Sequence, residues 1–215
     1  LSSALSLQPR SGAGATGKSH EDTIGAIATD IEERLPAQFD IEKALIDFPV
    51  RYEESMNTVL TQELLRFNRL TATMKRSLDD LRRAIKGLVL MSADLEAMGR
   101  SVALGRVPLV WSSVAYPSLK PCGPWVADLL KRLAFFQAWQ SAGTAPNTYW
   151  ISGFFFTQAF ITGTLQNYAR KHQLPIDTVA FDHAVLRPEE QREAEANNVA
   201  DVVVVWGLFI EGARL

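Results

Sequence analysis

The residues with the clearest chemical signature lie near the amino end, in the stretch GAGATGKS from Gly12 to Ser19. One glycine, four further residues and then Gly-Lys-Ser match a P-loop. In a P-loop, backbone N–H groups hold phosphates, the lysine reaches the outer phosphates and the serine hydroxyl binds Mg²⁺. Gly12, Gly17, Lys18 and Ser19 would be the binding residues. This motif defines one hypothesis, a small P-loop nucleoside triphosphatase using Lys18 and Ser19.

The elements around the motif do not favour that hypothesis. A working P-loop joins a buried strand to a helix, and a nucleoside triphosphatase needs a further acidic residue that holds Mg²⁺. The large apolar residues before Gly12 are only Leu1, Leu5 and Leu7, and the patterns in residues 20–106 predict only helices. We therefore interpret residues 1–19, rich in Ser, Gly and Ala, as a flexible connector. The motif is interpreted as a chance match, and no cofactor site is predicted.

Other candidate chemistry is sparse. The three histidines, His20, His172 and His183, are scattered, with no partner at metal-ligand spacing. Cys122 is the single cysteine, which excludes an internal disulfide and favours a reducing compartment such as the cytoplasm. A net charge of -2 gives no reason to expect nucleic acid, and no apolar run approaches the roughly 20 residues that span a bilayer. We predict no catalytic residues, no metal site, and neither nucleic acid nor membrane as a partner.

Apolar spacing predicts a mostly helical first half. Ile24, Ile27, Ile31 and Leu35 define one face of a helix that Ser19 would cap and Pro36 would end. Between Glu53 and Leu88 the apolar positions recur every 3.6 residues on average, which predicts one long helix packed in a bundle. Gly87 is expected to bend or break it before a shorter segment.

The second half of the sequence predicts a mixture of helices, strands and loops. The expected elements are an extended crossing (107–123), a helix with Pro124 in its first turn, a short β-prone stretch (TYWIS), a helix (153–173), a strand (176–183), a charged surface loop (187–198) and a strand buried on both faces (201–210). The pattern is α+β: a long helix and bundle, followed by an unfinished sheet.

Three long blocks resemble the C-terminal region of axonemal (ciliary) dynein heavy chains. They are Tyr52–Glu96, Tyr116–Trp139 and Tyr149–Leu186, the last containing WISGFFFTQAF and QNYARK. Dyneins are ATP-driven, minus-end-directed microtubule motors built on a ring of six AAA+ modules. The resemblance implies a non-catalytic segment that packs on that ring, with ATP and Mg²⁺ sites and the microtubule-binding stalk in upstream parts of the motor. It also implies the cytoskeleton of the cilium or flagellum axoneme as location, and dynein intermediate and light chains and microtubules as partners of the full motor.

The same resemblance divides the chain into a connector (1–19), helices associated with the last AAA+ module (20–106), and a C-terminal domain (107–215). That domain would be helical first and end in part of a small, truncated β-barrel. Both ends look cut, so we expect a piece of a longer protein. The expected structural or interface residues are Tyr116, Pro117, Trp150, Gly153, Phe155, Gln158 and Asn167, with Gly153 giving a tight entry into its helix. Phe154 to Phe156 are expected on that helix, buried on more than one side. A third hypothesis is a helical adaptor that binds other axonemal chains through exposed aromatic residues.

Overall fold

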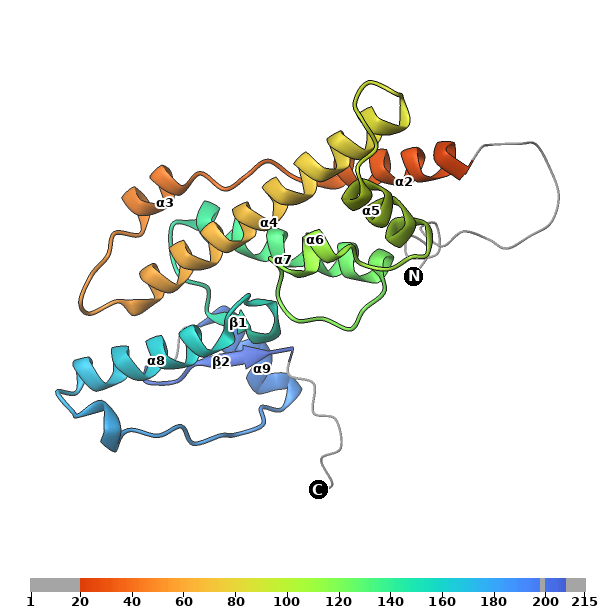
Figure 1. Cartoon of the computed structure of the whole chain (residues 1–215). Helices are drawn as coiled ribbons and strands as arrows, with labels where there is room; N and C mark the ends of the chain where they lie inside the picture. The colour runs from red at the N-terminus through yellow and green to blue at the C-terminus, as the bar shows by residue number, and fades with distance from the viewer. Residues whose placement is uncertain (1–19, 198–199, 208–215) are drawn as a thin grey trace. The chain divides into compact units, whose positions relative to one another are not determined.

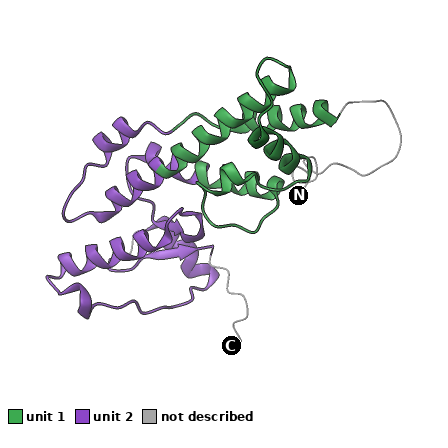
Figure 2. Cartoon of the chain, viewed as in Figure 1, with its two compact units in different colours: residues 1–38, 66–133 green, residues 39–65, 134–215 purple. Residues whose placement is uncertain are grey.

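The computed structural model describes residues 20–197 and 200–207, with the elements labelled in Figure 1. The chain forms two compact units that interleave in sequence (Figure 2). Unit 1 comprises Leu1–Gln38 and Arg66–Leu133, and unit 2 comprises Phe39–Leu65 and Ala134–Leu215. Neither unit coincides with the expected segments 20–106 and 107–215, so that division stays a prediction about domain boundaries in the family. No helix within the described ranges is both long and apolar enough to cross a membrane.

The long helix is confirmed as α4 (Ser55–Ile85). Its apolar stripe is buried along its whole length, with Leu60, Leu64, Phe67, Leu70, Met74 and Leu78 fully inaccessible to solvent. The first residues of α4 belong to unit 2 and the remainder to unit 1. Gly87, at φ +71, follows its end, as a chain reversal there requires. Ser92 then begins α5 (Ala93–Ala103), because its side chain accepts a hydrogen bond from the Leu95 N–H at 3.3 Å.

Unit 1 also contains α2 (His20–Arg34), α6 (Leu109–Ser112) and the first part of α7 (Cys122–Ala142). Of the predicted face, Ile24 and Ile31 are buried in α2, Ile27 is half-buried, and Leu35 is buried just after the helix ends; α2 packs against α5. Gly99 of α5 lies at this contact, where an added Cβ would be 3.4 Å from Leu81 and 3.9 Å from Ile24. An ion pair of 3.0 Å between Arg82 and Glu32 links α4 to α2.

Unit 2 adds α3 (Ile41–Asp47), β1 (Thr148–Trp150), a 3₁₀ turn η1 (Ile151–Gly153), α8 (Thr157–Lys171), a second 3₁₀ turn η2 (Ile176–Thr178), α9 (Pro188–Ala196) and β2 (Val204–Trp206). The two strands pair in parallel, with Tyr149 opposite Val205, and α8 and α9 lie in the connection between them. The described residues therefore form eight α-helices and one small sheet, and that sheet has two strands rather than a barrel. The mostly helical α+β class is confirmed at this level.

Two predicted elements after α8 are wrong. The expected strand at 176–183 begins instead as η2, where the Thr178 N–H and hydroxyl both bond to the Pro175 carbonyl. Residues 176–183 are exposed or half-exposed on both sides, so their alternation marks no buried face. The expected loop at 187–198 contains α9, because Pro188 occupies its first turn and strong helix formers follow. The Arg187 N–H donates to Glu190 at 2.8 Å and closes that first turn.

Other boundaries differ from expectation. Helix α8 begins at Thr157, so Phe154 to Phe156 precede it; Phe154 is buried and Phe156 is half exposed. The crossing at 107–123 includes the short helix α6 and the start of α7. Helix α3 was not predicted, although Asp40 accepts a hydrogen bond from the Lys43 N–H at its start. The described part of the 201–210 segment, residues 201–207, contains the three-residue strand β2. This strand is half exposed rather than buried on both faces.

Candidate functional site

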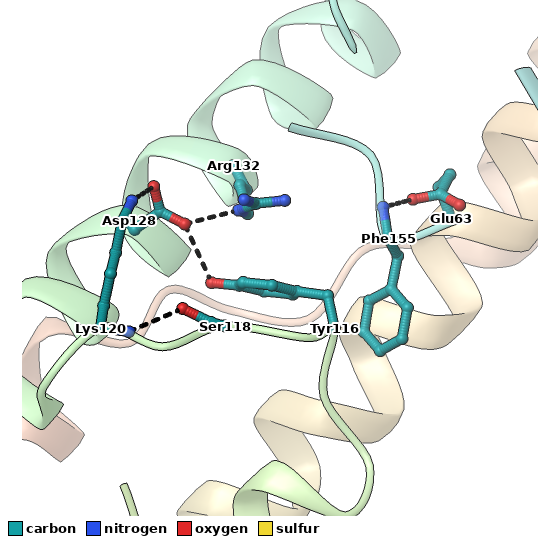
Figure 3. A network of polar contacts seen from close by, with 7 residues as sticks. All are labelled: Glu63, Tyr116, Ser118, Lys120, Asp128, Arg132 and Phe155. Atoms are coloured by element: carbon teal, nitrogen blue, oxygen red, sulfur yellow. Dashed lines mark hydrogen bonds and ion pairs between the residues drawn. The ribbon is translucent and has the colours of Figure 1, made fainter. Parts of the chain in front are cut away.

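A buried carboxylate in unit 1 is surrounded by two cations and a phenol (Figure 3). Asp128 of α7 accepts hydrogen bonds from Arg132 at 2.7 Å, Lys120 at 2.5 Å and the Tyr116 hydroxyl at 3.3 Å. Arg132 is one helical turn from Asp128 and also lies 3.8 Å from the centre of the Tyr116 ring, a cation–π geometry. Lys120 and Tyr116 come from the segment before α7. The network therefore fastens that segment to the helix.

The electrostatics of this network suit a clamp. Burial by itself raises the pKa of Asp128, but hydrogen bonds from Lys120 and Arg132 and their charges outweigh it and lower the pKa. Burial raises the pKa of Tyr116 well above its ordinary value. At neutral pH the carboxylate is ionised and the phenol stays a hydrogen-bond donor. An acid whose charge is this strongly stabilised is a poor proton acceptor, so the arrangement favours holding two segments together over general-base chemistry.

A second buried carboxylate, in unit 2, holds the amino end of α8 (Figure 3). Glu63 of α4 is fully buried and accepts hydrogen bonds from the backbone N–H groups of Phe155 and, at 3.1 Å, Phe156. Phe156 caps α8 without a side-chain hydrogen bond. A carboxylate is favourable at this position because the amino end of a helix carries unpaired N–H groups and a partial positive charge.

The other end of the same helix pair, at the start of α4 and the last turns of α8, is joined by amide and guanidinium groups. Asn167 accepts from the Ser55 N–H at 2.7 Å and donates to Glu54 at 2.7 Å, and that same Glu54 oxygen accepts from the Met56 N–H at 3.0 Å. Arg170 donates to the Tyr52 carbonyl and, at 2.8 Å, to the Ser55 hydroxyl. Asn167 thus satisfies an orphan donor at the start of α4 from a helix more than a hundred residues away.

The two helices approach closely at Gly163. A Cβ built there would lie 2.7 Å from the Met56 methyl carbon and 3.2 Å from a Val59 methyl group. The Met56 methyl group, the end of a flexible side chain, would have to move for any larger residue, and the Val59 methyl group would have to give by a few tenths of an ångström; a bulky β-branched side chain would crowd both. Glycine is needed here for its small size, since Gly163 lies within a regular helix.

Trp150 of β1 connects the small sheet to the aromatic side chains of α7. Its ring stacks on Trp206 of β2 at 5.4 Å and meets Phe135 edge-on at 6.3 Å. Gly153 and Gly207 both lie against the indole, and a Cβ at Gly153 would be 2.6 Å from a ring carbon. Gly207 also has a φ of +77, which favours glycine.

The family model for the C-terminal domain of the dynein heavy chain matches residues 1–215. The protein belongs to this family. It is similar to human dynein axonemal heavy chain 3, with 53% identity over 94% of the present sequence. It is also similar to rat dynein axonemal heavy chain 1, with 48% identity over 98% of the present sequence. Human dynein axonemal heavy chain 12 is 48% identical over 94% of the length. The sequence spans only 5% or 6% of the length of these relatives.

The residues predicted from the sequence to be structural or interface residues of this dynein domain differ in burial and in contacts. Trp150 and Gly153 touch each other, but Gly153 lies in η1 rather than at the entry to a helix. The Phe155 N–H donates a hydrogen bond to Glu63. The Asn167 side chain donates to Glu54 and accepts from the Ser55 N–H. Tyr116 is buried in unit 1, whereas its neighbour Pro117 is exposed, and Gln158 is exposed on α8. An individual role for each of the seven stays a proposal.

Structural roles for Glu63, Asp128 and Gly163 are not among the predictions made from the sequence. Glu63 lies three residues after Leu60 within the buried stripe of α4, and a lone charge in an apolar stripe was the available signal. Asp128 and Arg132 are four apart beside Leu129 and Leu133, which marked an ion pair at the edge of a core.

The nominated P-loop residues, Gly12, Gly17, Lys18 and Ser19, lie outside the described residues. Within the described ranges, no group of three His, Cys, Asp or Glu side chains is arranged to hold a metal. Cys122 is buried, and burial raises the pKa of its thiol to about 11. That thiol is therefore protonated at neutral pH and packs as a small apolar group.

Proposed function

We propose that this protein is the non-catalytic C-terminal segment of an axonemal dynein heavy chain. It packs on the AAA+ ring of an ATP-driven, minus-end-directed microtubule motor in the axoneme of a cilium or flagellum. The observation that supports this most directly is the similarity to axonemal heavy chains over nearly the whole sequence. The ATP and Mg²⁺ sites belong to other parts of the full motor.

The geometry of the described residues supports a mechanical role. Asp128 fastens a loop to α7, Glu63 fastens the start of α8, and Asn167 fastens α8 to the start of α4. Each polar group is directed at backbone or at a neighbouring charge within the same unit. Such clamps keep helices in a fixed arrangement, which a segment needs if it is to transmit or limit ring movements.

Further parts of the proposal follow from the family. Residues 20–106 accompany the last AAA+ module and 107–215 form the C-terminal domain, whereas the connector expected at 1–19 lies outside the described residues. The parallel pair of β1 and β2 is taken as part of a small β-barrel with which that domain ends. The partners are the ring of the same heavy chain and, through the full motor, dynein intermediate and light chains and microtubules.

Lysine-reactive cross-linking of the full heavy chain, followed by mass spectrometry, tests the packing. The exposed residues Lys86 and Lys131 report on unit 1, and Lys43 reports on unit 2. We expect cross-links from both units to the ring modules. The variant Lys86→Arg is the matched control, which should lose its own cross-links and keep those of Lys131. Cross-links confined to this segment, in a motor that still hydrolyses ATP, would contradict the proposal.

A further inference from the structure

Residues 106–121 form a loop that is closed at its neck. The Cys122 N–H donates to the Gly105 carbonyl at 2.8 Å, which joins the two ends of the loop. Gly105, at φ +65, ends α5, and the Arg106 N–H bonds back to Ser101 at 2.8 Å. A compact surface loop with its ends tied together is a type of segment that is frequently functional.

Buried side chains order both limbs of the 106–121 loop from within. Trp111 is fully buried, donates its indole N–H to Ser77 at 2.8 Å and stacks on Trp125 at 6.1 Å. Tyr116, on the other limb, also stacks on Trp125, with the two ring centres 6.0 Å apart. Both Tyr116 and Lys120 also donate hydrogen bonds to Asp128. The loop backbone is therefore held in place next to the residues that it exposes.

The loop exposes three large apolar side chains beside serines and two basic residues. Leu109 is 80% exposed, Val110 is 42% exposed and Leu119 is fully exposed. Pro117 and Pro121 lie two residues before and after Leu119, and they restrict the backbone at their own positions and at the preceding residues Tyr116 and Lys120. The only charged residues in 106–121 are Arg106 and Lys120, and Lys120 is paired with Asp128 of α7, so the positive charge that the loop displays is mainly that of Arg106. An ordered loop that displays large apolar side chains beside positive charge is complementary to an apolar surface with acidic residues.

We propose that the 106–121 loop is a preorganised contact loop that binds an apolar, acidic protein surface elsewhere in the same heavy chain. The choice of partner rests on the proposed function. It is also supported by the relatives, in which all but 5% or 6% of the polypeptide lies outside this segment. Covalent connection raises the effective concentration of such a surface, so a few side chains are sufficient. Because the loop is already ordered, binding loses little conformational entropy.

A lipid surface is the less favoured occupant. Trp111 and Tyr116, the loop residues of the kind that anchor proteins at a membrane interface, are buried and face inward. The ammonium group of Lys120 is held by Asp128. Protein contact therefore uses the side chains that the loop displays, whereas membrane insertion would need those that it hides.

A photo-cross-linking amino acid at position 119 of the full heavy chain tests the inference. We expect cross-links to a ring peptide that contains Asp or Glu. Leu109→Glu places a negative charge on the same loop and should lower the yield about tenfold, the value of burying one leucine. Ile46→Glu changes a side chain that is 77% exposed in unit 2 and should leave the yield unchanged. Unchanged hydrogen exchange in α5 and α7 would show that Leu109→Glu still folds.

The outcomes separate this inference from the proposed function. If lysine cross-links reach the ring but position 119 reacts only within this segment, the contact loop is wrong and the ring packing stands. If neither reaches the ring, both are wrong. Cross-linking from position 119 that Leu109→Glu does not reduce would also overturn the contact loop. If the full heavy chain bound anionic lipid vesicles and substitution of Leu119 abolished that binding, the partner of the loop would be a membrane and the proposed protein contact would be wrong.

Discussion

The carboxylate of Glu63 accepts a hydrogen bond from the backbone N–H of Phe155, 92 residues further along the sequence. A second one comes from Phe156 at 3.1 Å. Together they supply the start of α8 with the acceptors that its own residues do not provide. The carboxylate of Glu63 is therefore one of the groups that hold α8 on α4, beside Asn167 and Arg170 at the other end of the pair.

Glu63→Ala is expected to destabilise the start of α8 by about 2 kcal/mol, because two partly buried N–H groups lose their carboxylate acceptor. Glu63→Gln keeps one acceptor oxygen and should cost about half as much. Hydrogen exchange of the amides of Phe155 and Phe156, followed in the full heavy chain, measures the effect. Glu33→Ala on the exposed face of α2 is the control. Equal exchange in Glu63→Ala and the unsubstituted protein would refute the role of Glu63.

Asp128 should make unit 1 sensitive to acid. Its pKa is lowered in the folded state, so its contribution to stability is complete above the unfolded pKa of about 3.9 and is lost as the pH falls through the folded value. Asp128→Asn should lower the free energy of unfolding at pH 7 by about 2 kcal/mol, since the charge-assisted hydrogen bonds from Arg132 and Lys120 to the carboxylate are lost. It should also flatten the dependence of stability on pH below about pH 4.

The measurement for Asp128 is a urea titration of the full heavy chain, read by protease susceptibility of this segment with thermolysin at neutral pH and pepsin in acid. Asp30→Asn removes the partner of Arg34 in an exposed ion pair and should cost less than about 1 kcal/mol. A loss in Asp128→Asn no larger than in Asp30→Asn would show that the network is not a clamp.

Gly163→Val should separate α8 from α4. Its side chain would meet Met56 and Val59, whose nearest atoms lie 2.7 Å and 3.2 Å from the position of a Cβ. We expect a loss of about 2 kcal/mol from overpacking, and Met56→Ala in the same protein should restore part of it by making room. The amide exchange of Ser55, whose N–H donates to Asn167, is the readout.

Gly25→Ala is the matched control for Gly163→Val. Gly25 also lies within a helix, α2, but among the described residues no atom lies within 4 Å of its added Cβ. Alanine should therefore raise the stability of α2 by about 1 kcal/mol through helix propensity alone. Stabilisation by Gly163→Val as well would mean that the close helix contact is not needed.

Lys18→Ala should leave Mg-ATP binding and hydrolysis by the full heavy chain unchanged, because we interpret GAGATGKS as a chance match. Titration calorimetry and a steady-state ATPase assay measure the two quantities. Ser19→Ala, which would remove the Mg²⁺ ligand of a P-loop, should behave in the same way. Micromolar Mg-ATP binding that Lys18→Ala abolishes would instead support the nucleoside triphosphatase.

Local sequence was sufficient for the helices with strong periodicity. The stripe from Met56 to Leu88 predicted α4, Pro124 lies in the first turn of α7, and Gly87 breaks the helix where expected. The error at 176–183 has the same local origin. Alternation over a few residues is equally compatible with an exposed turn, and only packing decides whether it marks a strand.

The sequence by itself determined the family, the main helices and the absence of a sheet pattern around GAGATGKS, because each of these depends on residues close together along the polypeptide. The tertiary structure alone decided that Glu63 meets Phe155, that Asn167 meets Ser55, and that Tyr116 and Lys120 both meet Asp128. A buried polar group must find a partner, but the local pattern does not say which of many distant groups it will be. That choice follows from how helices pack, and close approaches such as Gly163 on Met56 fix it.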